Sequence, residues 1–327
     1  MRKLFTALLC CFVLNTSISQ ETTLKLASDV WPPFTNVAEK GGLAQDLVNF
    51  ALKRSGVNME SEIMSFDAVI SGIKSDEIDG STALWMSEDR KAYLLFSKAY
   101  LYNQLVLVAK KGEDVSAKSL ADLKGKSVGI VGSYAYGGTY SDPDGVTYVR
   151  GNNDQENLEK LLNDELDYIL VDALLAQHAK VHQPKAVTES LEIGTNPMLV
   201  QSLHFGVRKS HPQAQQIIAG FNREIDKMLA DGSYSKILQL TWIKADMDGD
   251  GVQELVLNGN KAGKIAPSSA YAIQPNQQHD TIPTNRFYID GKLYEGWDNV
   301  PNYYKEAPPT VQQMESVNLF NIPLKKN

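Results

Sequence analysis

Arg90 lies in the polar first part of SEDRKAYLLFSKAY, residues 87–100. A guanidinium group is planar, permanently charged and able to donate two parallel hydrogen bonds, so it suits a ligand carboxylate better than an ammonium group does. The alternative is a solvated charge at the start of a helix, as for most single arginines. The residue type alone leaves both interpretations open.

Asp172 ends the apolar segment YILVD, residues 168–172, which we predict to be a strand. Open α/β sheets bind ligands at the carboxyl ends of their strands, so this carboxylate is a candidate ligand-binding group. The alternative is that it caps a helix predicted over residues 173–182, which is a common use of aspartate. The two roles are compatible.

Oxygen-bearing groups recur through DMDGDGVQE, residues 246–254. They are, in order, the side chains of Asp246, Asp248 and Asp250, the main-chain carbonyl of Val252 and the side chain of Glu254. This spacing suits Ca²⁺, although an EF-hand would also need a glutamate where Leu257 stands. The pattern is closer to the calcium loops of β-propeller and repeat modules. It predicts a structural Ca²⁺; the alternative is an acidic, solvated turn.

The Gly-rich segment GSYAYGG, residues 132–138, is a predicted turn whose main-chain N–H groups can bind an anion. It lacks the Gly-x-Ser-x-Gly pattern of a nucleophile elbow and the spacing of a dinucleotide-binding fingerprint. No nucleophile–base pair stands out in the chain. We therefore expect no catalytic residues.

These candidate residues depend on an alternation of predicted strands and helices. In the first part of the chain we predict strands over 24–29, 80–84 and 104–109, and helices over 42–56 and 66–79. Leu43, Leu47, Phe50 and Ala51 recur at helical spacing, so we expect them on the buried face of the first helix. Such an alternation indicates an α/β sheet.

A second alternation follows, and after it the composition changes. We predict strands over 127–131, 168–172 and 202–209, and helices over 153–167, 173–182 and 211–233. Residues 244–327 are rich in Asn, Gly, Pro and Gln, with a hairpin signal at Asp290-Gly291. We predict a small β-rich appendix there.

The chain has 327 residues, enough for two ordinary domains. Hydrophobic residues make up 43% and charged residues 22%, which indicates a soluble globular protein. The formal net charge is −7 and there is no run of Lys or Arg, so we expect no nucleic acid partner.

The first nineteen residues have the pattern of a signal peptide. Arg2 and Lys3 precede an apolar stretch over residues 4–14 that is too short to span a bilayer, and small residues follow at a cleavage site. Both cysteines, Cys10 and Cys11, lie inside this segment, which excludes disulfides and cysteine nucleophiles from the mature protein. We predict export to the periplasm.

Six segments taken together resemble the periplasmic solute-binding proteins of family 3, the polar amino acid family. They are DVWPPF, FDAVISGIKSDEIDG, MSEDRKAYLLFSKAY, LADLKGKSVGIVGSY, LDYILVDALLA and FNREIDKMLADGSYSKILQLTW. The resemblance covers about residues 22–243 and rests on the order and spacing of the segments.

The resemblance implies a two-lobed α/β fold, the type II periplasmic-binding-protein fold, with a ligand cleft between the lobes. Lobe 1 would comprise residues 20–108 and 203–243, and lobe 2 residues 109–202. The chain would cross between them near residues 106–111 and 198–205. The C-terminal extension over 244–327, with its calcium-like loop, would be an addition.

The resemblance also implies roles for the charged candidates. Arg90, with Ser87 three residues before it, falls on the family's carboxylate-binding arginine segment. Asp172 falls on the aspartate that holds the substrate α-ammonium. A zwitterion held by this pair would bridge the two lobes.

Aromatic and hydroxyl positions follow from the same resemblance. Trp31 and Phe66 align with rings that enclose the ligand side chain; the alternative for each is ordinary core packing. Ser133 matches a hydroxyl residue that helps to hold the carboxylate. Tyr134 stands where a small hydroxyl residue is usual, so this chain departs from the family at a position that shapes the pocket.

The function implied is binding of an amino acid or similar small carboxylate by a monomer, for delivery to the permease of an ABC importer. One alternative is a sensor or adaptor whose liganded form docks on a membrane receptor. A second is a dehydratase-like enzyme on the same fold.

Overall fold

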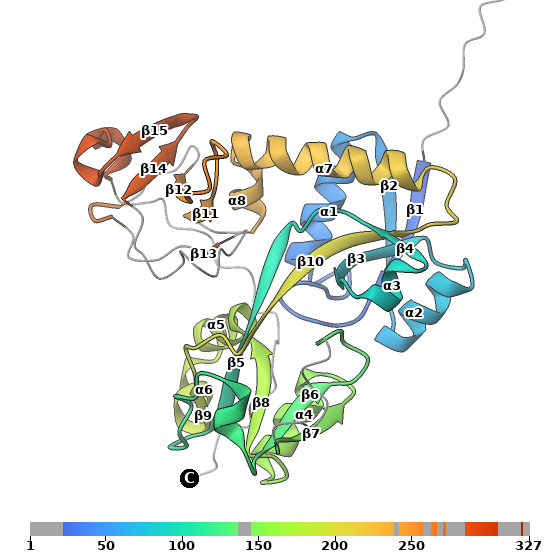
Figure 1. Ribbon diagram of the computed structural model, residues 1–327, viewed down its shortest axis with the longest axis vertical. Coiled ribbons are helices and arrows are strands. Elements are labelled where there is room, and N and C mark those ends of the chain that lie inside the picture. The colour runs from blue at the N-terminus through green and yellow to red at the C-terminus, as the bar shows by residue number, and fades with distance from the viewer. Residues whose placement is uncertain are drawn as a thin grey trace, which may run out of the picture.

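The computed structural model describes residues 22–136, 145–238, 242–257, 263–266, 271–272, 285–306 and 322. The predicted signal peptide over 1–19 lies outside these residues. Figure 1 shows two α/β lobes joined by long strands, with a small β module beside one of them.

Lobe 1 is built from the first and the last parts of residues 22–237. Its elements are β1 (Thr22–Ser28), α1 (Leu43–Arg54), β2 (Val57–Ile63), α2 (Phe66–Lys74), β3 (Gly80–Trp85), α3 (Glu88–Lys91), β4 (Leu94–Phe96), α7 (Ala214–Asp231) and α8 (Ser233–Ile237). Local signals set the ends of these helices. Ser65 caps α2 by accepting a hydrogen bond from the main-chain N–H of Ala68, and α7 ends at Gly232, whose φ of 80° suits glycine.

Lobe 2 repeats the alternation on a smaller scale. It contains η1 (Leu120–Leu123), β6 (Ser127–Val131), β7 (Thr147–Gly151), α4 (Asp154–Leu162), β8 (Tyr168–Asp172), α5 (Ala173–His182), α6 (Pro184–Ser190) and β9 (Leu191–Ile193). The side chain of Asn153 caps α4 and that of Asp172 caps α5. Strands β6, β7 and β8 pair in parallel, so their carboxyl ends meet at one edge.

Two long strands, β5 (Leu101–Lys110) and β10 (Leu199–Arg208), connect the lobes. They pair antiparallel, with Leu199 opposite Leu105, and stand together in the middle of a ten-stranded sheet. Its order is β2-β1-β3-β10-β5-β8-β6-β7, with β4 paired to β10 and β9 to β5. Strand β10 pairs with β3 and β4 of lobe 1, and β5 pairs with β8 and β9 of lobe 2. Figure 1 shows the two strands passing from one lobe to the other.

The predicted two-lobed α/β fold with a β-rich appendix is thus confirmed. The proposed lobe boundaries, 108/109 and 202/203, fall within β5 and β10 and stay a prediction. Among the described helices, none has the length and apolar character that crossing a membrane requires.

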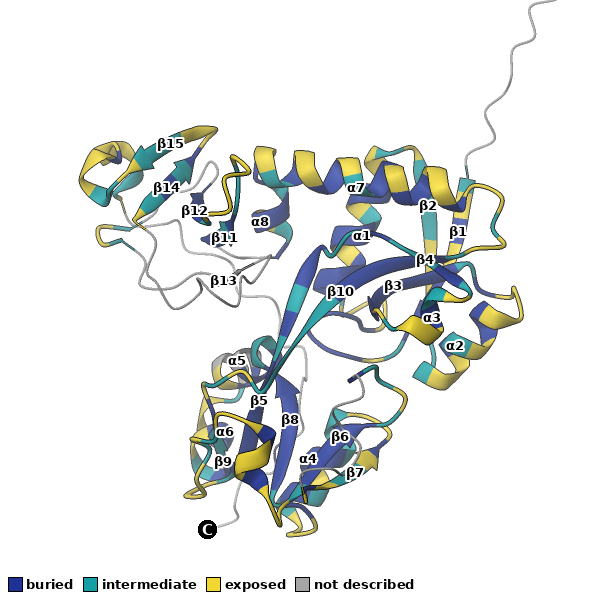
Figure 2. Ribbon diagram, viewed as in Figure 1, coloured by how far each residue is buried: buried dark blue, intermediate teal, exposed yellow. Residues whose placement is uncertain are grey.

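The core corrects one detail of the predicted first helix. Leu43, Leu47 and Ala51 of α1 are buried as expected, but Phe50 is 40% exposed. The buried stripe includes Val48 and continues past Ala51, so position 50 is rotated towards solvent. By contrast β3 and β8 are buried along their whole length, which Figure 2 shows as dark strands inside each lobe.

The C-terminal module is a five-stranded sheet of order β13-β11-β12-β14-β15. Its described elements are β11 (Ile243–Ala245), β12 (Glu254–Leu257), β13 (Tyr271–Ala272), β14 (Arg286–Ile289), β15 (Lys292–Glu295), η3 (Trp297–Asn299) and η4 (Asn302–Tyr304). The predicted hairpin is confirmed: Asp290 and Gly291 both have positive φ, 47° and 82°, between antiparallel β14 and β15.

Candidate functional site

Arg90 is only 7% exposed, so it is not a solvated surface charge. Its Nη1 donates a hydrogen bond of 2.7 Å to the carbonyl of Trp85, and its Nη2 donates one of 2.8 Å to the carbonyl of Ser133. The guanidinium carbon lies 4.9 Å from the centre of the Phe66 ring. Burial lowers the pKa of Arg90 from its usual value. The arginine therefore lies in the contact between the two lobes.

A short helix positions this arginine. Ser87 precedes α3, and its Oγ accepts a 3.3 Å hydrogen bond from the main-chain N–H of Arg90. Ser87 therefore acts as an N-cap in this structure. Its hydroxyl is used to orient the helix that carries Arg90.

Four aromatic rings meet next to Arg90. The Tyr134 ring from lobe 2 makes edge contacts with three lobe 1 rings, at centroid distances of 5.8 Å to Trp31, 5.3 Å to Phe66 and 5.3 Å to Trp85. We call the Trp31, Phe66 and Trp85 rings the aromatic box. The space left inside is about 10 Å³, room for about one water molecule. The sequence identified Trp31, Phe66 and Tyr134 but missed Trp85.

The hydroxyl of Tyr134 donates a 2.8 Å hydrogen bond to Oδ2 of Asp29, at the back of the aromatic box. Burial raises the pKa of Asp29, and it raises that of Tyr134 as well. Sequence reasoning missed Asp29, although it directly follows the first strand as Asp172 ends a later one. That shared placement is the signal that could have found it.

Ser133 lies on the same turn with a positive φ of 61°. Its Oγ donates a hydrogen bond to Oδ1 of Asp67 in lobe 1, while its carbonyl oxygen accepts the bond from Arg90. The structure thus brings Ser133 to Arg90 through its main chain. The predicted use of its hydroxyl on a ligand carboxylate stays a prediction.

Asp172 is 2% exposed. Its Oδ1 accepts a 2.7 Å hydrogen bond from the main-chain N–H of Leu174, which is the capping role. Its Oδ2 has no hydrogen-bond partner among the described residues. Burial raises the pKa of Asp172 to about 7. Neighbouring hydrogen-bond groups, among them the Asn103 side chain, partly oppose this shift, and Oδ2 can accept a bond from a further donor.

A third acid shares this region. Asp154 opens α4, and burial followed by the charges of Asp29 and Asp172 raises its pKa to about 7. The three carboxyls come from lobe 1 and lobe 2 and are close enough to affect one another's ionisation. Nothing in the sequence analysis marked Asp154, because an aspartate at a helix start is common.

No hydrogen bond or ion pair joins Arg90 to Asp172 among the described residues. Beside Arg90 the cleft opens into a cavity of about 790 Å³. Its lining comes from both lobes and from β10, and its polar members include Asp67, Glu88, Arg150 and Gln201. A small polar molecule can reach the outer face of Arg90 from this cavity.

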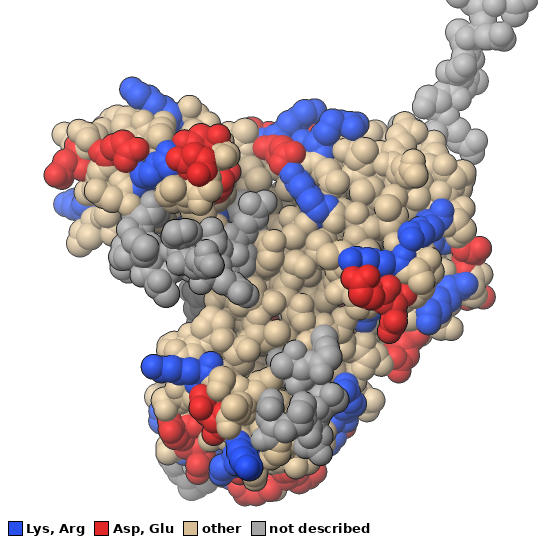
Figure 3. Space-filling view, viewed as in Figure 1, with Lys and Arg blue, Asp and Glu red and all other residues tan. Residues whose placement is uncertain are grey.

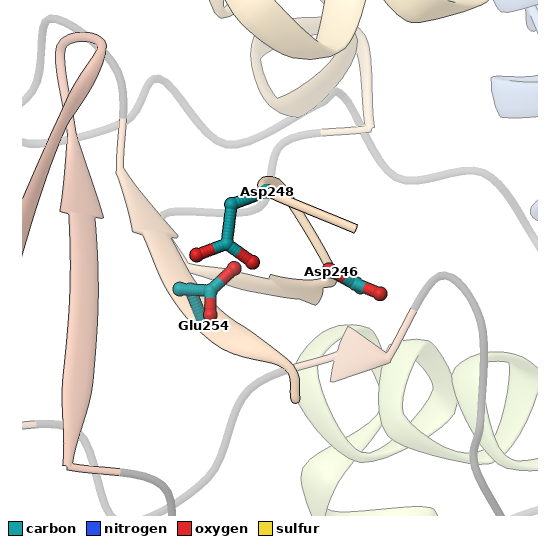
Figure 4. Close-up of side chains that lie close together, drawn as sticks. All are labelled: Asp246, Asp248 and Glu254. Carbon is teal, nitrogen blue, oxygen red and sulfur yellow. The ribbon is translucent and has the colours of Figure 1, made fainter. Parts of the chain in front are cut away.

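The calcium-like loop lies in the C-terminal module, between β11 and β12. Carboxylate oxygens of Asp246, Asp248 and Glu254 all lie within 4.8 Å of one another, and Figure 4 shows Asp248 and Glu254 facing each other. Asp246 also accepts hydrogen bonds from the main-chain N–H groups of Gly249 and Gly251, which shape the turn. Oxygen donors of this kind fit Ca²⁺.

Arg286 of β14 contacts three acids of this loop, and no sequence pattern pointed to it. Its guanidinium nitrogens lie 2.7 Å from Asp248, 2.8 Å from Asp250 and 3.0 Å from Glu254. Glu254 is fully buried, and this burial raises its pKa. Figure 3 shows acidic side chains gathered on the module.

Two predicted metal ligands, Asp250 and the Val252 carbonyl, are not among the three whose carboxylate oxygens converge. Asp250 accepts a hydrogen bond from the main-chain N–H of Val252 and pairs with Arg286, and the Val252 side chain is exposed. Their predicted contact with a metal stays a prediction.

Comparison with known proteins gives consistent matches. The family model for bacterial extracellular solute-binding proteins, family 3, matches residues 24–245. An L-arginine-binding protein of Pseudomonas aeruginosa is 27% identical over 220 residues, 63% of this chain and 82% of that protein. The L-cystine-binding protein TcyJ of Escherichia coli is 25% identical over 240 residues, 72% of this chain and 87% of that protein.

Solved structures agree with this fold. An ancestral arginine-binding protein bound to arginine superposes with a TM-score of 0.57 at 28% identity, and the match covers 66% of this chain and 97% of the other. The C-terminal module lies beyond the residues that the family model matches, apart from β11.

Proposed function

The chain belongs to the bacterial extracellular solute-binding proteins of family 3, and from this we propose that it binds an amino acid between its lobes for delivery to an ABC importer. The observation that carries the proposal is the burial of Arg90 between the lobes, where its fork reaches from lobe 1 to lobe 2. Burying a guanidinium is costly unless a partner offsets its charge, and the carboxylate of a bound ligand would offset it.

The ligand is held at both charged ends. Arg90 binds the α-carboxylate, and the free oxygen of Asp172 accepts a hydrogen bond from the α-ammonium. The aromatic box receives the side chain, with Asp29 at its back. Three acids whose charges interact favour a ligand with a second cationic group, as in the arginine and cystine named for two relatives.

Thermal-shift and calorimetric titration of the refolded, ligand-free chain with the common L-amino acids and L-cystine tests this function. We expect a raised melting temperature for at least one of them, and loss of that shift in Arg90→Gln. Arg223→Gln, which removes an exposed arginine of α7, is the matched control. The proposal is wrong if no amino acid shifts the wild type, or if Arg90→Gln responds as the wild type does.

The setting of this activity is the periplasm, with an N-terminal signal peptide over residues 1–19 and a monomeric chain. Its relatives are binding proteins, and we assign this chain no catalytic residues. Pulse-labelling of the exported protein and sequencing of its mature N-terminus test the cleavage site.

A receptor-docking sensor is the second candidate. It is favoured by the C-terminal module, of which only β11 lies within the region matched by the family model. Crosslinking of the amino-acid-loaded chain to membranes separates the two roles. An ABC permease as the crosslinked partner supports import, and a signalling receptor supports the sensor.

We also propose that the module binds a structural Ca²⁺ through Asp246, Asp248 and Glu254, with Asp250 and the Val252 carbonyl as further ligands. The donor set supports it, since hard cations prefer carboxylate oxygens. Arg286 now balances part of the same negative charge, so a cation would compete with it.

A further inference from the structure

In the described part of the chain, one short segment of lobe 2 makes three hydrogen bonds to lobe 1. We call residues 133–135 the latch segment. Ser133 donates its hydroxyl hydrogen to Asp67 and accepts from Arg90 through its carbonyl, and Tyr134 donates to Asp29. All three of these partners belong to lobe 1.

The same segment is anchored at the hinge. The carbonyl of Ala135 accepts a 2.9 Å hydrogen bond from the side chain of Gln201 on β10. The latch segment is thus bonded to lobe 1 through Ser133 and Tyr134 and to strand β10 through Ala135. A loop with this many satisfied contacts is a defined structural element.

The contacts repeat those that a bound amino acid would make. The Ser133 carbonyl oxygen accepts from Arg90 where a ligand carboxylate oxygen would accept. The Tyr134 ring fills the aromatic box where a ligand side chain would lie, and leaves only about 10 Å³ there. Its hydroxyl gives Asp29 the hydrogen bond that a polar side-chain end would give.

We propose that Tyr134, with the Ser133 carbonyl, is an internal occupant of the ligand site that latches the lobes closed in the absence of ligand and must leave before an amino acid can bind. Tyr134 then determines specificity by competition: a ligand binds only if its contacts exceed those of the tyrosine ring, its hydroxyl and the carbonyl. The inference rests on the proposed function for the identity of the competitor, but the latch itself does not.

If Tyr134 occupies the site, the wild type binds amino acids more weakly than its open state would. When the competent state is a small fraction of the population, the apparent dissociation constant rises by the inverse of that fraction. Removing the ring should therefore tighten amino acid binding, whereas a tyrosine that only lined the pocket would contribute contacts, so that its removal would weaken binding. The direction of this change separates an occupant from a contact residue.

The first test needs no amino acid. In Tyr134→Gly the aromatic box is vacated, and p-cresol, which is the tyrosine side chain as a free molecule, should bind with one-to-one stoichiometry in calorimetric titration. The wild type should show no binding, because its box is full. Adding Asp29→Asn to Tyr134→Gly should weaken p-cresol binding, since the carboxylate that accepts from the phenol is lost.

Small-angle X-ray scattering of the same ligand-free proteins measures whether the lobes are open or closed. The radius of gyration of Tyr134→Gly should exceed that of the wild type, and p-cresol should not restore it, because the free ring is no longer attached to lobe 2. Tyr303→Gly, which removes a 64% exposed tyrosine of the C-terminal module, is the matched control and should leave the radius of gyration unchanged. Circular dichroism confirms that each variant is folded.

The second test uses L-arginine, titrated into the wild type and Tyr134→Gly. We expect roughly ten- to a hundredfold tighter binding to the variant, as release from a competing closed state predicts. Equal or weaker binding by the variant overturns the competition. Equal scattering of wild type and Tyr134→Gly, or p-cresol binding of equal strength to both, overturns the latch.

The two proposals fail separately. If neither L-arginine nor the wider amino acid panel binds either protein, the proposed function fails, while p-cresol titration and scattering still decide the latch. If amino acids bind the wild type but Tyr134→Gly neither opens nor accepts p-cresol, the latch fails and the function stands.

Discussion

At the scale of single residues, charge burial decides how the cleft responds to pH. Asp172 and Asp154 have pKa values of about 7 in the folded chain, far above the value of about 4 for an unfolded aspartate. Both groups are therefore protonated at mildly acidic pH. Each retains a proton that a cationic ligand would expel.

A pH-dependent stability follows. Between about pH 4 and pH 7 the folded state binds more protons than the unfolded state, so stability falls as pH rises through this range and levels off above pH 7. Asp172→Asn, which stays neutral, should flatten the decline. Urea unfolding at several pH values measures it, with Asp164→Asn at an exposed site as the control. A ligand-free wild type whose stability rises steadily from pH 4 to pH 7 contradicts this assignment.

Ligand binding should release the same protons. An ammonium group on Asp172 favours the charged carboxylate, so at about pH 6 binding of an amino acid should expel protons into the buffer. Calorimetry in buffers of different ionisation enthalpy measures the number released. Asp172→Asn should reduce it, and an unchanged number in that variant would place the proton elsewhere.

At the scale of elements, the N-cap of the short helix α3 helps to position Arg90 in the site. Ser87 fixes the start of the helix, and Arg90 follows at the position from which it reaches Trp85 and Ser133. Helix α3 has only four residues, so its cap is a large part of what holds it.

Ser87→Ala should therefore cost about 1 kcal/mol of stability. It should also weaken amino acid binding, because the main-chain N–H of Arg90 loses the hydrogen bond that holds it at the start of α3. Ser119→Ala removes the cap of η1, a short helix whose residues do not line the cleft. It should cost a similar amount of stability without changing affinity. Urea unfolding and calorimetric titration compare the two variants. Equal affinity in both would show that the Ser87 cap does not position Arg90.

The calcium-like loop makes an element-scale prediction of its own. Ca²⁺ should raise the melting temperature of the wild type with an affinity of roughly 10⁻⁴ to 10⁻³ M, the range of extracellular sites. Arg286→Gln should bind Ca²⁺ more tightly, because the competing guanidinium is gone. Asp248→Asn should abolish the effect. A melting temperature that ignores Ca²⁺ in both the wild type and Arg286→Gln shows that the loop is an ion-paired turn.

At the scale of the whole molecule, the module and the lobes share buried surface. Ile243, Ala245 and Val256 of the module pack in the same hydrophobic cluster as Phe221 of lobe 1. A separate cluster, which includes Trp242 and Phe287, forms the module's own core. The module is therefore joined to lobe 1 through β11 and β12.

Lobe 1 and the module should unfold in one transition in calorimetry. Val256→Ala removes buried apolar contacts at this junction and should lower the free energy of unfolding by about 2 kcal/mol. It should also lower the temperature at which the module unfolds. Val252→Ala, at a 46% exposed site in the same module, is the control and should have little effect. Two well-separated transitions in the wild type would show that the module folds independently.

Several features could be predicted from local patterns along the chain. The alternation of strands and helices, the hairpin at Asp290-Gly291 and the six family-like segments are encoded by periodicity, turn residues and spacing along the chain. The error at Phe50 has the same origin, since the helical repeat fixes a spacing but tertiary packing selects which stripe is buried.

The residues that occupy the two candidate sites depend on tertiary packing and could not be predicted in this way. Tyr134 meets Asp29 across a separation of 105 residues, and Arg286 meets Asp250 across 36. Contacts between residues so far apart leave no repeat or spacing in the sequence, because they depend on how the lobes and the module pack. The sequence thus specified an arginine, rings and acids suited to a ligand, and the fold placed the chain's own tyrosine and arginine among them.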